Sequence, residues 1–255
     1  MKLLILLAMG LNVAFAQDKA EEIVRKVRLY NQGFQSEVSE MSLLIEDEQK
    51  RQIERKLKAK TIEINNDEVS NKSIIEFVSP QDVKGTKLLT WLNKKEDKSQ
   101  WIFLPALKKK KRILSGNQNS SFMGSEFTYE DIGGREIELY SYKLLKENKT
   151  AAGKTWTIEQ VLKSNKSQKM IIVIDEKLMS LVKAEYLNSR GEITKVSEMK
   201  NFESFKVGDK LLYRAKEITM LNKENLKSST FKWSKRDIGG KVSENEFNPN
   251  LLDRP

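Results

Sequence analysis

The chain has 255 residues and a net charge of +10, with 46 basic and 36 acidic side chains and neither histidine nor cysteine. The absence of these two residue types excludes Ser-His-Asp and Cys-His catalysis, disulfide bridges and most zinc sites. The length allows one large β domain or two small ones, and the basic balance suits anionic lipid headgroups or acidic partners.

Residues 1–16 predict a cleavable signal peptide. Lys2 gives a positive start, residues 3–13 are mostly apolar, and residues 14–16 form an A-x-A cleavage pattern. The apolar run is too short for a stable membrane span, which needs about 20 residues, and no later run approaches that length. We therefore expect an exported protein of a bacterial periplasm that begins near Gln17, for which nucleic acid is the least suitable partner.

A short amphipathic helix is expected next. Asp18 and Glu21 have the spacing of a capping box, and Ile23 and Val27 recur at helical spacing. Gly33 can adopt the positive φ that ends a helix.

Beyond residue 33, apolar and polar residues alternate, which is the pattern of antiparallel strands with one covered face. In the first half, strands are expected at residues 41–45, 51–60, 75–77, 86–92 and 100–104. Two of these, at 88–92 and 101–104, are apolar on both faces. Each must therefore be covered on both sides, by the barrel interior and a helix.

The second half continues the pattern after a polar loop at 115–121 and an irregular or short helical segment at 122–129. Strands are expected at residues 137–145, 155–162, 170–174, 181–187, 193–202, 211–220 and 231–233. Short strands at regular spacing indicate a barrel or a strongly curved sheet. No Pro/Gly-rich linker divides the chain, so residues 17–255 are expected to form a single domain, with the tail 247–255 on its surface.

The most distinctive segment is FMGSEFTYED, from Phe122 to Asp131, which follows WIFLP at 101–105 and KKKKR at 108–112. Together with the signal peptide, the strand pattern and the closing FNPNLLDR at 247–254, these residues resemble the LolA-like family of outer membrane lipoprotein-sorting proteins. The resemblance extends over essentially the whole mature chain. It implies an incomplete, strongly curved antiparallel β-barrel whose open side is covered by the N-terminal helix and by short helices and loops.

The resemblance also implies a function. A periplasmic carrier would bind the acyl chains of a lipid or lipoprotein in an apolar barrel cavity and transfer them across the envelope, from an inner-membrane transporter to an outer-membrane acceptor. Such a carrier needs no catalysis, cofactor or metal. The alternative is a non-carrier accessory or adaptor with a filled barrel, which docks on an inner-membrane exporter of lipid or another hydrophobic substrate.

The candidate ligand-binding residues are large apolar side chains of the strands and of the 122–129 segment. They are Phe77, Leu89, Trp91, Trp101, Phe103, Phe122, Met123, Phe127 and Tyr129. The two tryptophans and Phe103 either line a cavity or belong to an ordinary barrel core. The segment is either a mobile lid, for which methionine is well suited, or a fixed plug in the barrel mouth.

The candidate headgroup or membrane contacts are Lys108, Lys109, Lys110, Lys111 and Arg112. Near an anionic leaflet each basic residue contributes about 1 kcal/mol. The alternative is a solvated strand whose lysines prevent edge pairing. Paired acids such as Glu130 and Asp131 lack a second catalytic element, so an enzyme is not expected.

Overall fold

The computed structural model describes residues 18–253 except 65, 97 and 152, so the predicted signal peptide lies outside the described residues. The described strands form one 13-stranded sheet. They are β1 (Ser36–Glu46), β2 (Gln52–Glu63), β3 (Val69–Ser79), β4 (Lys87–Asn93), β5 (Ser99–Leu104), β6 (Lys109–Ile113), β7 (Tyr140–Thr150), β8 (Gly153–Leu162), β9 (Lys169–Asp175), β10 (Ser180–Leu187), β11 (Ile193–Val207), β12 (Lys210–Asn222) and β13 (Ser228–Ile238).

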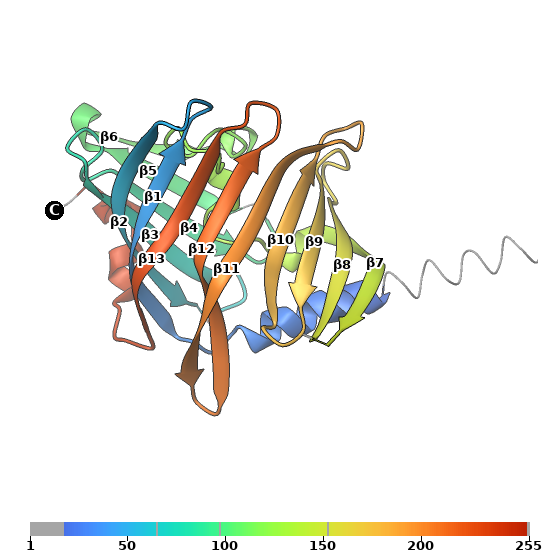
Figure 1. Ribbon diagram of the computed structural model, residues 1–255. Coiled ribbons are helices and arrows are strands. Elements are labelled where there is room, and N and C mark those ends of the chain that lie inside the picture. Colours follow the sequence, from blue (N-terminus) through green and yellow to red (C-terminus); the bar gives the residue numbers. More distant parts are fainter. Residues whose placement is uncertain (1–17, 65, 97, 152, 254–255) are drawn as a thin grey trace, which may run out of the picture.

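The strand order explains why the barrel stays open. From β1 the chain winds outward to the edge strand β6, crosses to the opposite edge at β7, and returns strand by strand to β13, which pairs with β1. The sheet curves, with β5 and β6 behind β1 and β13, while β6 and β7 remain its two edges (Figure 1). The predicted incomplete, strongly curved antiparallel barrel with an N-terminal helix is therefore confirmed.

Two elements cover the inner face of this sheet. Residues 114–139 run from β6 to β7 across it, and we name them the crossing segment; it includes the short 3-10 turns η2 (Ser115–Asn117), η3 (Tyr129–Asp131) and η4 (Ile137–Leu139). The N-terminal helix, residues 18–30, covers the half formed by β7 to β10. Its Ala20, Ile23 and Val24 are buried in the same cluster as Trp156 and Ile158, as expected for an amphipathic helix.

The C-terminal tail covers part of the outer face. Its turns η5 (Glu244–Phe247) and η6 (Pro249–Leu251) lie against strands β3 to β5. Phe247 is fully buried and Leu252 nearly so, so the expectation of a surface tail is wrong. The same contact supplies the second cover of β4 and β5, which is this tail rather than the expected helix.

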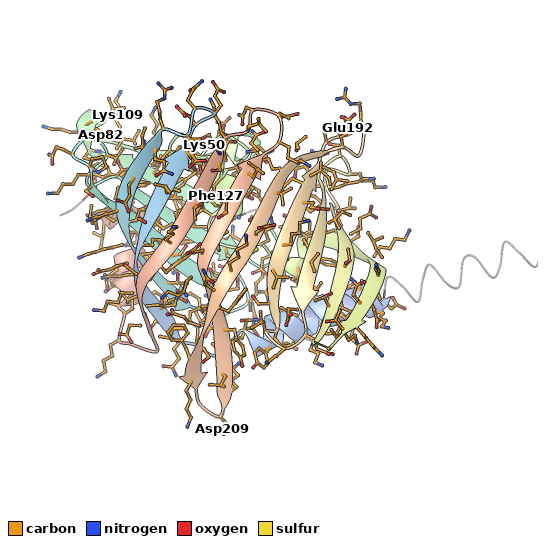
Figure 2. All side chains as sticks on the ribbon, in the orientation of Figure 1. Lys50, Asp82, Lys109, Phe127, Glu192 and Asp209 are labelled. Carbon is orange, nitrogen blue, oxygen red and sulfur yellow. The ribbon has the colours of Figure 1, made fainter. Side chains whose placement is uncertain are left out.

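The two ends of the strands form two rims. Figure 2 shows Lys50 and Glu192 at one rim and Asp209 at the tip of the long β11–β12 hairpin, which extends beyond the other rim. Phe127 lies between them, within the curve of the sheet (Figure 2). Any interior site is therefore enclosed by the strands, the crossing segment and the N-terminal helix.

Candidate functional site

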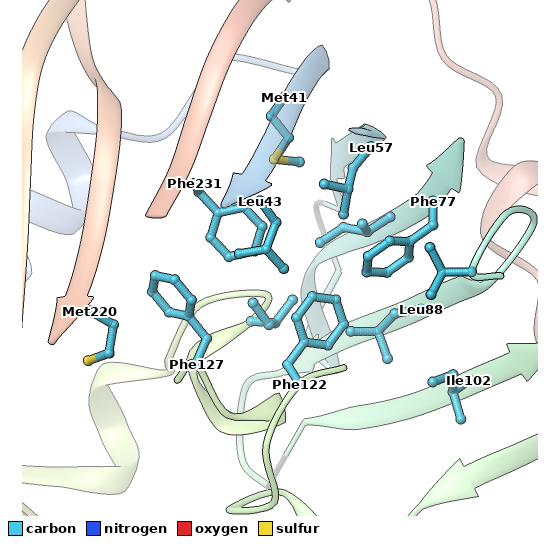
Figure 3. Close-up of a cluster of buried hydrophobic side chains, with 13 residues drawn as sticks. Met41, Leu43, Leu57, Phe77, Leu88, Ile102, Phe122, Phe127, Met220 and Phe231 are labelled. Carbon is cyan, nitrogen blue, oxygen red and sulfur yellow. The ribbon is translucent and has the colours of Figure 1, made fainter. Parts of the chain in front are cut away.

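An aromatic cluster fills the half of the interior beneath β1 to β5 (Figure 3). Phe122 of the crossing segment is fully buried, with its ring centroid 5.7 Å from that of Phe77 and 5.6 Å from that of Tyr129. Phe127 packs 4.8 Å from Phe231. The crossing segment thus supplies core side chains to this half of the molecule.

Hydrogen bonds hold the backbone of the crossing segment in place. The buried Lys98 ammonium donates to the carbonyl oxygens of Glu130, Ile132 and Gly134, at 2.7, 3.3 and 2.6 Å. Side chains from four strands make further contacts: Arg55 to the Met123 carbonyl, Gln100 to the Tyr129 carbonyl, Lys195 to the Glu126 carbonyl and Ser229 to the Glu126 amide. In this conformation the segment is a packed plug.

Beyond the aromatic cluster lies a cavity of about 310 Å³, which we name the inner pocket. Its lining is mainly apolar and comes from β1, β3, the strands β10 to β13 and the crossing segment. The apolar lining residues are Met41, Ile75, Phe127, Ile132, Leu181, Ala184, Met199, Ile218, Met220, Phe231 and Trp233. Inward side chains of a strand alternate with outward ones, so β11, β12 and β13 each contribute two residues that are two positions apart.

A polar trio forms one wall of the inner pocket. Arg135 Nη2 lies 2.8 Å from Asp131 Oδ1, and the Tyr186 hydroxyl donates to the same oxygen at 2.7 Å. Burial would raise the pKa of Asp131, but Arg135 and the hydrogen bonds from Thr128 and Tyr186 outweigh it and lower that pKa. Burial also raises the pKa of Tyr186, so its hydroxyl stays protonated. The trio is a satisfied polar network inside an apolar interior.

On the other side of this trio lies a second cavity of about 270 Å³, the side pocket. Asp131, Arg135 and Tyr186 line both pockets. The rest of the side pocket is lined mainly by amides and hydroxyls: Asn119, Thr128, Tyr140, Gln160, Ser167, Gln168 and Thr194. The side pocket is therefore the more polar of the two, and the two pockets share a wall.

Five of the nine predicted ligand-binding residues lie on the inner face. Phe77, Phe122, Met123, Phe127 and Tyr129 all belong to the aromatic cluster or pack against it. Among these five, Phe127 lines the inner pocket. The other four pack in or against the aromatic cluster and do not line that pocket.

The remaining four, Leu89, Trp91, Trp101 and Phe103, lie on the outer face under the C-terminal tail. Trp91 Nε1 donates to the Phe247 carbonyl oxygen at 2.9 Å. The expectation that these four side chains share a cavity with Phe127 is wrong, because they lie on the opposite face of the sheet. Leu88 and Ile102 face the inner cluster, so their neighbours in sequence must face the other way.

The basic stretch 108–112 is exposed and mostly forms the edge strand β6, but the strand divides it between two faces. Lys111 pairs with the inward residue Ile102, whereas Lys110 pairs with the outward residue Phe103. Lys110 also donates to the Pro249 carbonyl oxygen of the tail at 2.8 Å. The five cations therefore do not form one ridge.

The sequence analysis missed the polar trio and most of the inner pocket. Met41 was noted only as part of an alternating strand, and Arg135 and Tyr186 carried no signal because they lie 51 residues apart in the chain. The alternation of side chains along a strand could have identified Met199, Ile218 and Met220 as pocket residues, if the sequence had shown which face of each strand points inward.

Residues 18–253, apart from 65, 97 and 152, contain neither a metal-binding cluster of side chains nor a membrane-spanning helix. No three acidic, histidine or cysteine side chains there come together in a way that could hold a metal ion. No helix in the same region is long and apolar enough to cross a membrane.

Comparison with known proteins gives several matches. A family model described as an uncharacterized protein matches residues 69–254. The chain is 30% identical to a domain assigned as an outer membrane lipoprotein-sorting protein from Vibrio parahaemolyticus, covering 93% of this chain and 100% of that one, with a TM-score of 0.86.

Two further solved structures share the fold. A DUF1329 family protein from Desulfovibrio piger has a TM-score of 0.84 at 20% identity, covering 93% of this chain and 99% of that one. A LolA superfamily protein from Nitrosomonas europaea has a TM-score of 0.65 at 17% identity, covering 90% and 97%. No protein of curated function matches the sequence.

Proposed function

This chain belongs to the LolA-like family of outer membrane lipoprotein-sorting proteins, and from that premise we propose that it is a periplasmic carrier of acyl chains. It binds one chain of a lipid or lipoprotein in the inner pocket and carries it across the envelope, between an inner-membrane transporter and an outer-membrane acceptor. The signal peptide predicted for residues 1–16 directs it to that compartment. Transfer requires no bond to be made or broken, so no catalysis is proposed.

The observation that supports this proposal is the apolar inner pocket of about 310 Å³. An engineered protein cavity of about 150 Å³ binds benzene, so by proportion the inner pocket holds about 12 carbons. Each buried CH₂ contributes about 0.8 kcal/mol, which is enough for micromolar binding of one such chain. A longer or second chain needs space that Phe122 now occupies.

Release follows from the same geometry. The aromatic cluster already buries the apolar side chains of the crossing segment, so any ligand that displaces Phe122 competes with an intramolecular partner. The net binding free energy is then a difference between two buried states, which keeps binding reversible.

The test is displacement of a fluorescent C12 fatty acid from the mature protein. Ile218 lines the inner pocket, and Ile218→Gln is expected to weaken binding at least tenfold, because it places an amide among apolar groups. Leu221→Gln is the matched control, since it lies on the same strand and, at three residues' distance, on the opposite face. The proposal is contradicted if both folded variants lose fatty-acid affinity equally, or if neither variant loses affinity.

A second candidate function is supported by the outer surface. A groove of about 620 Å³ there is lined by three lysines, two acids (Glu76 and Glu246, the latter paired with Lys60) and apolar residues of the tail, which leaves a small excess of positive charge. An adaptor could dock an acidic partner, such as an exporter subunit, on this groove or on the β6 edge. Charge reversal at Lys109 and Lys111 would then abolish association with the membrane partner and leave acyl-chain binding intact.

A further inference from the structure

The side pocket has the features of a headgroup site. It adjoins the inner pocket through the shared wall of Asp131, Arg135 and Tyr186. A molecule with its chain in the apolar cavity therefore has a polar chamber next to the end of that chain. This inference rests on the proposed acyl-chain function, because the chain is what brings the headgroup to this chamber.

One amide of this chamber has no partner among the described residues. Gln160 is only 7% exposed and lines the side pocket. Its side chain makes no hydrogen bond to any residue in the described part of the chain. The amide atoms themselves are not fully buried, so their two N–H donors and carbonyl acceptor face the open space of the pocket. A bound polar group would satisfy it.

The charged groups of the chamber are balanced among themselves. Asp131 is paired with Arg135 at 2.8 Å, and Glu130 lies 3.9 Å from both the Arg135 guanidinium and the Lys98 ammonium. Lys195 lies 3.7 Å from the Glu126 carboxylate. These ion pairs leave no uncompensated charge for a ligand to neutralise, although the whole chain carries +10.

One more cation lies at the opening of the chamber. Lys169 also lines the side pocket, but the residue is exposed, so solvent and salt screen its charge. The enclosed polar groups that remain are amides and hydroxyls, beside the apolar Met170 and Leu187; they include the hydroxyl of Tyr140, whose pKa burial raises to about 12. Neutral donors and acceptors are the partners that sugar or glycerol hydroxyls require.

We infer that the side pocket binds an uncharged, hydroxyl-rich headgroup, and that the ligand class is a single-chain amphiphile with such a headgroup. The chain occupies the inner pocket, the polar trio lies at the junction, and Gln160 hydrogen-bonds to the headgroup hydroxyls. With the headgroup in the side pocket, the inner pocket of about 310 Å³ has room for one such chain.

The test compares ligands that share a C12 chain, below their micellar concentrations. Dodecyl maltoside carries a neutral sugar, dodecanoate an anionic group and dodecyltrimethylammonium a cation. The wild-type protein is expected to bind the maltoside about tenfold more tightly than either charged ligand, the equivalent of one or two added hydrogen bonds. Maltose alone is expected to show no binding, because it lacks the chain.

Gln160→Leu keeps the volume of the side chain and removes its hydrogen bonds. We expect Gln160→Leu to bind the maltoside and the charged ligands about equally, so that the tenfold preference for the maltoside is lost. The control Gln52→Leu lies at an exposed site on β2 outside both pockets and should keep that preference. If Gln160→Leu proves unstable, Gln160→Ala is expected to lower the preference likewise.

The outcomes separate this inference from the carrier function. Equal binding of all three ligands, or a preference for dodecanoate, overturns the headgroup assignment and leaves the carrier proposal standing. Binding of maltose alone at the maltoside affinity makes the pocket a sugar site without a chain. Failure of every C12 ligand overturns the carrier proposal, and the headgroup assignment with it.

Discussion

Truncation of Phe122 tests whether the crossing segment occupies space that a ligand can use. The side chain is fully buried, and its ring lies 6.5 Å from that of Phe231, which lines the inner pocket. Phe122→Ala removes about 2 kcal/mol of transfer free energy and leaves a cavity of about 100 Å³, which at 24 cal/mol per Å³ costs about 2 kcal/mol more. We expect the free energy of unfolding without ligand to fall by about 4 kcal/mol.

The same change should enlarge the space for ligand. By the proportion that links about 150 Å³ to benzene, an added 100 Å³ holds about four more carbons. At about 0.8 kcal/mol for each buried CH₂, a C16 fatty acid should bind Phe122→Ala about 100-fold more tightly than wild type, whereas a C12 chain should bind equally well.

The assay combines urea denaturation with titration of C12 and C16 fatty acids. Phe103→Ala is the matched control, because it removes the same ring from the outer face, where the side chain is only partly buried. It should lower stability less and leave the chain-length preference unchanged. The reasoning is refuted if folded Phe122→Ala shows the same C16 affinity as wild type.

Three further predictions concern the supports of the site. Gly133→Ala should lower the free energy of unfolding by about 2–4 kcal/mol, because the φ angle at Gly133 is +86° and an added Cβ would lie 2.5 Å from Thr90 Cγ2. Thr90→Ser removes that methyl group, so the double variant should regain part of the lost stability in denaturation curves. Phe247→Ala should cost about 3–5 kcal/mol without changing fatty-acid affinity, and a weaker affinity would contradict its placement on the outer face. Asp131 has a lowered pKa beside Arg135, so its stabilising effect is full above about pH 4 and is lost as the pH falls further. Denaturation at pH 7 should therefore separate wild type from Asp131→Asn, and the difference should shrink towards pH 3; a constant difference would argue against the ion pair.

The fold could be predicted from the sequence because the patterns that specify its strands are local. The alternation of apolar and polar residues predicted nearly every strand, and the polar turns between the strands are short. β13 is longer than expected, Ser228–Ile238 instead of 231–233, because residues 228–230 and 234–237 are all polar or charged and carry no apolar alternation. The strand expected at 137–145 begins instead with the turn η4, and the strand proper starts at Tyr140.

The site could be predicted only in part, because its residues depend on which face of each strand points inward. The apolar pattern of β4 and β5 correctly required two covers, but nothing local revealed that the outer one is the tail with Phe247. Trp91 and Trp101 were therefore placed with Phe127 on grounds of size alone. The polar trio joins Asp131 of the crossing segment to Tyr186 of β10, and no sequence spacing encodes such a distant contact.

The most direct test of the carrier account is native mass spectrometry of the mature protein purified from the periplasm, followed by organic extraction of any bound molecule. The account predicts one co-purifying single-chain lipid for each protein, which is lost in Ile218→Gln and retained in Leu221→Gln. A protein that remains at its unliganded mass, even after incubation with C12 lipids, would contradict it and favour the docking adaptor.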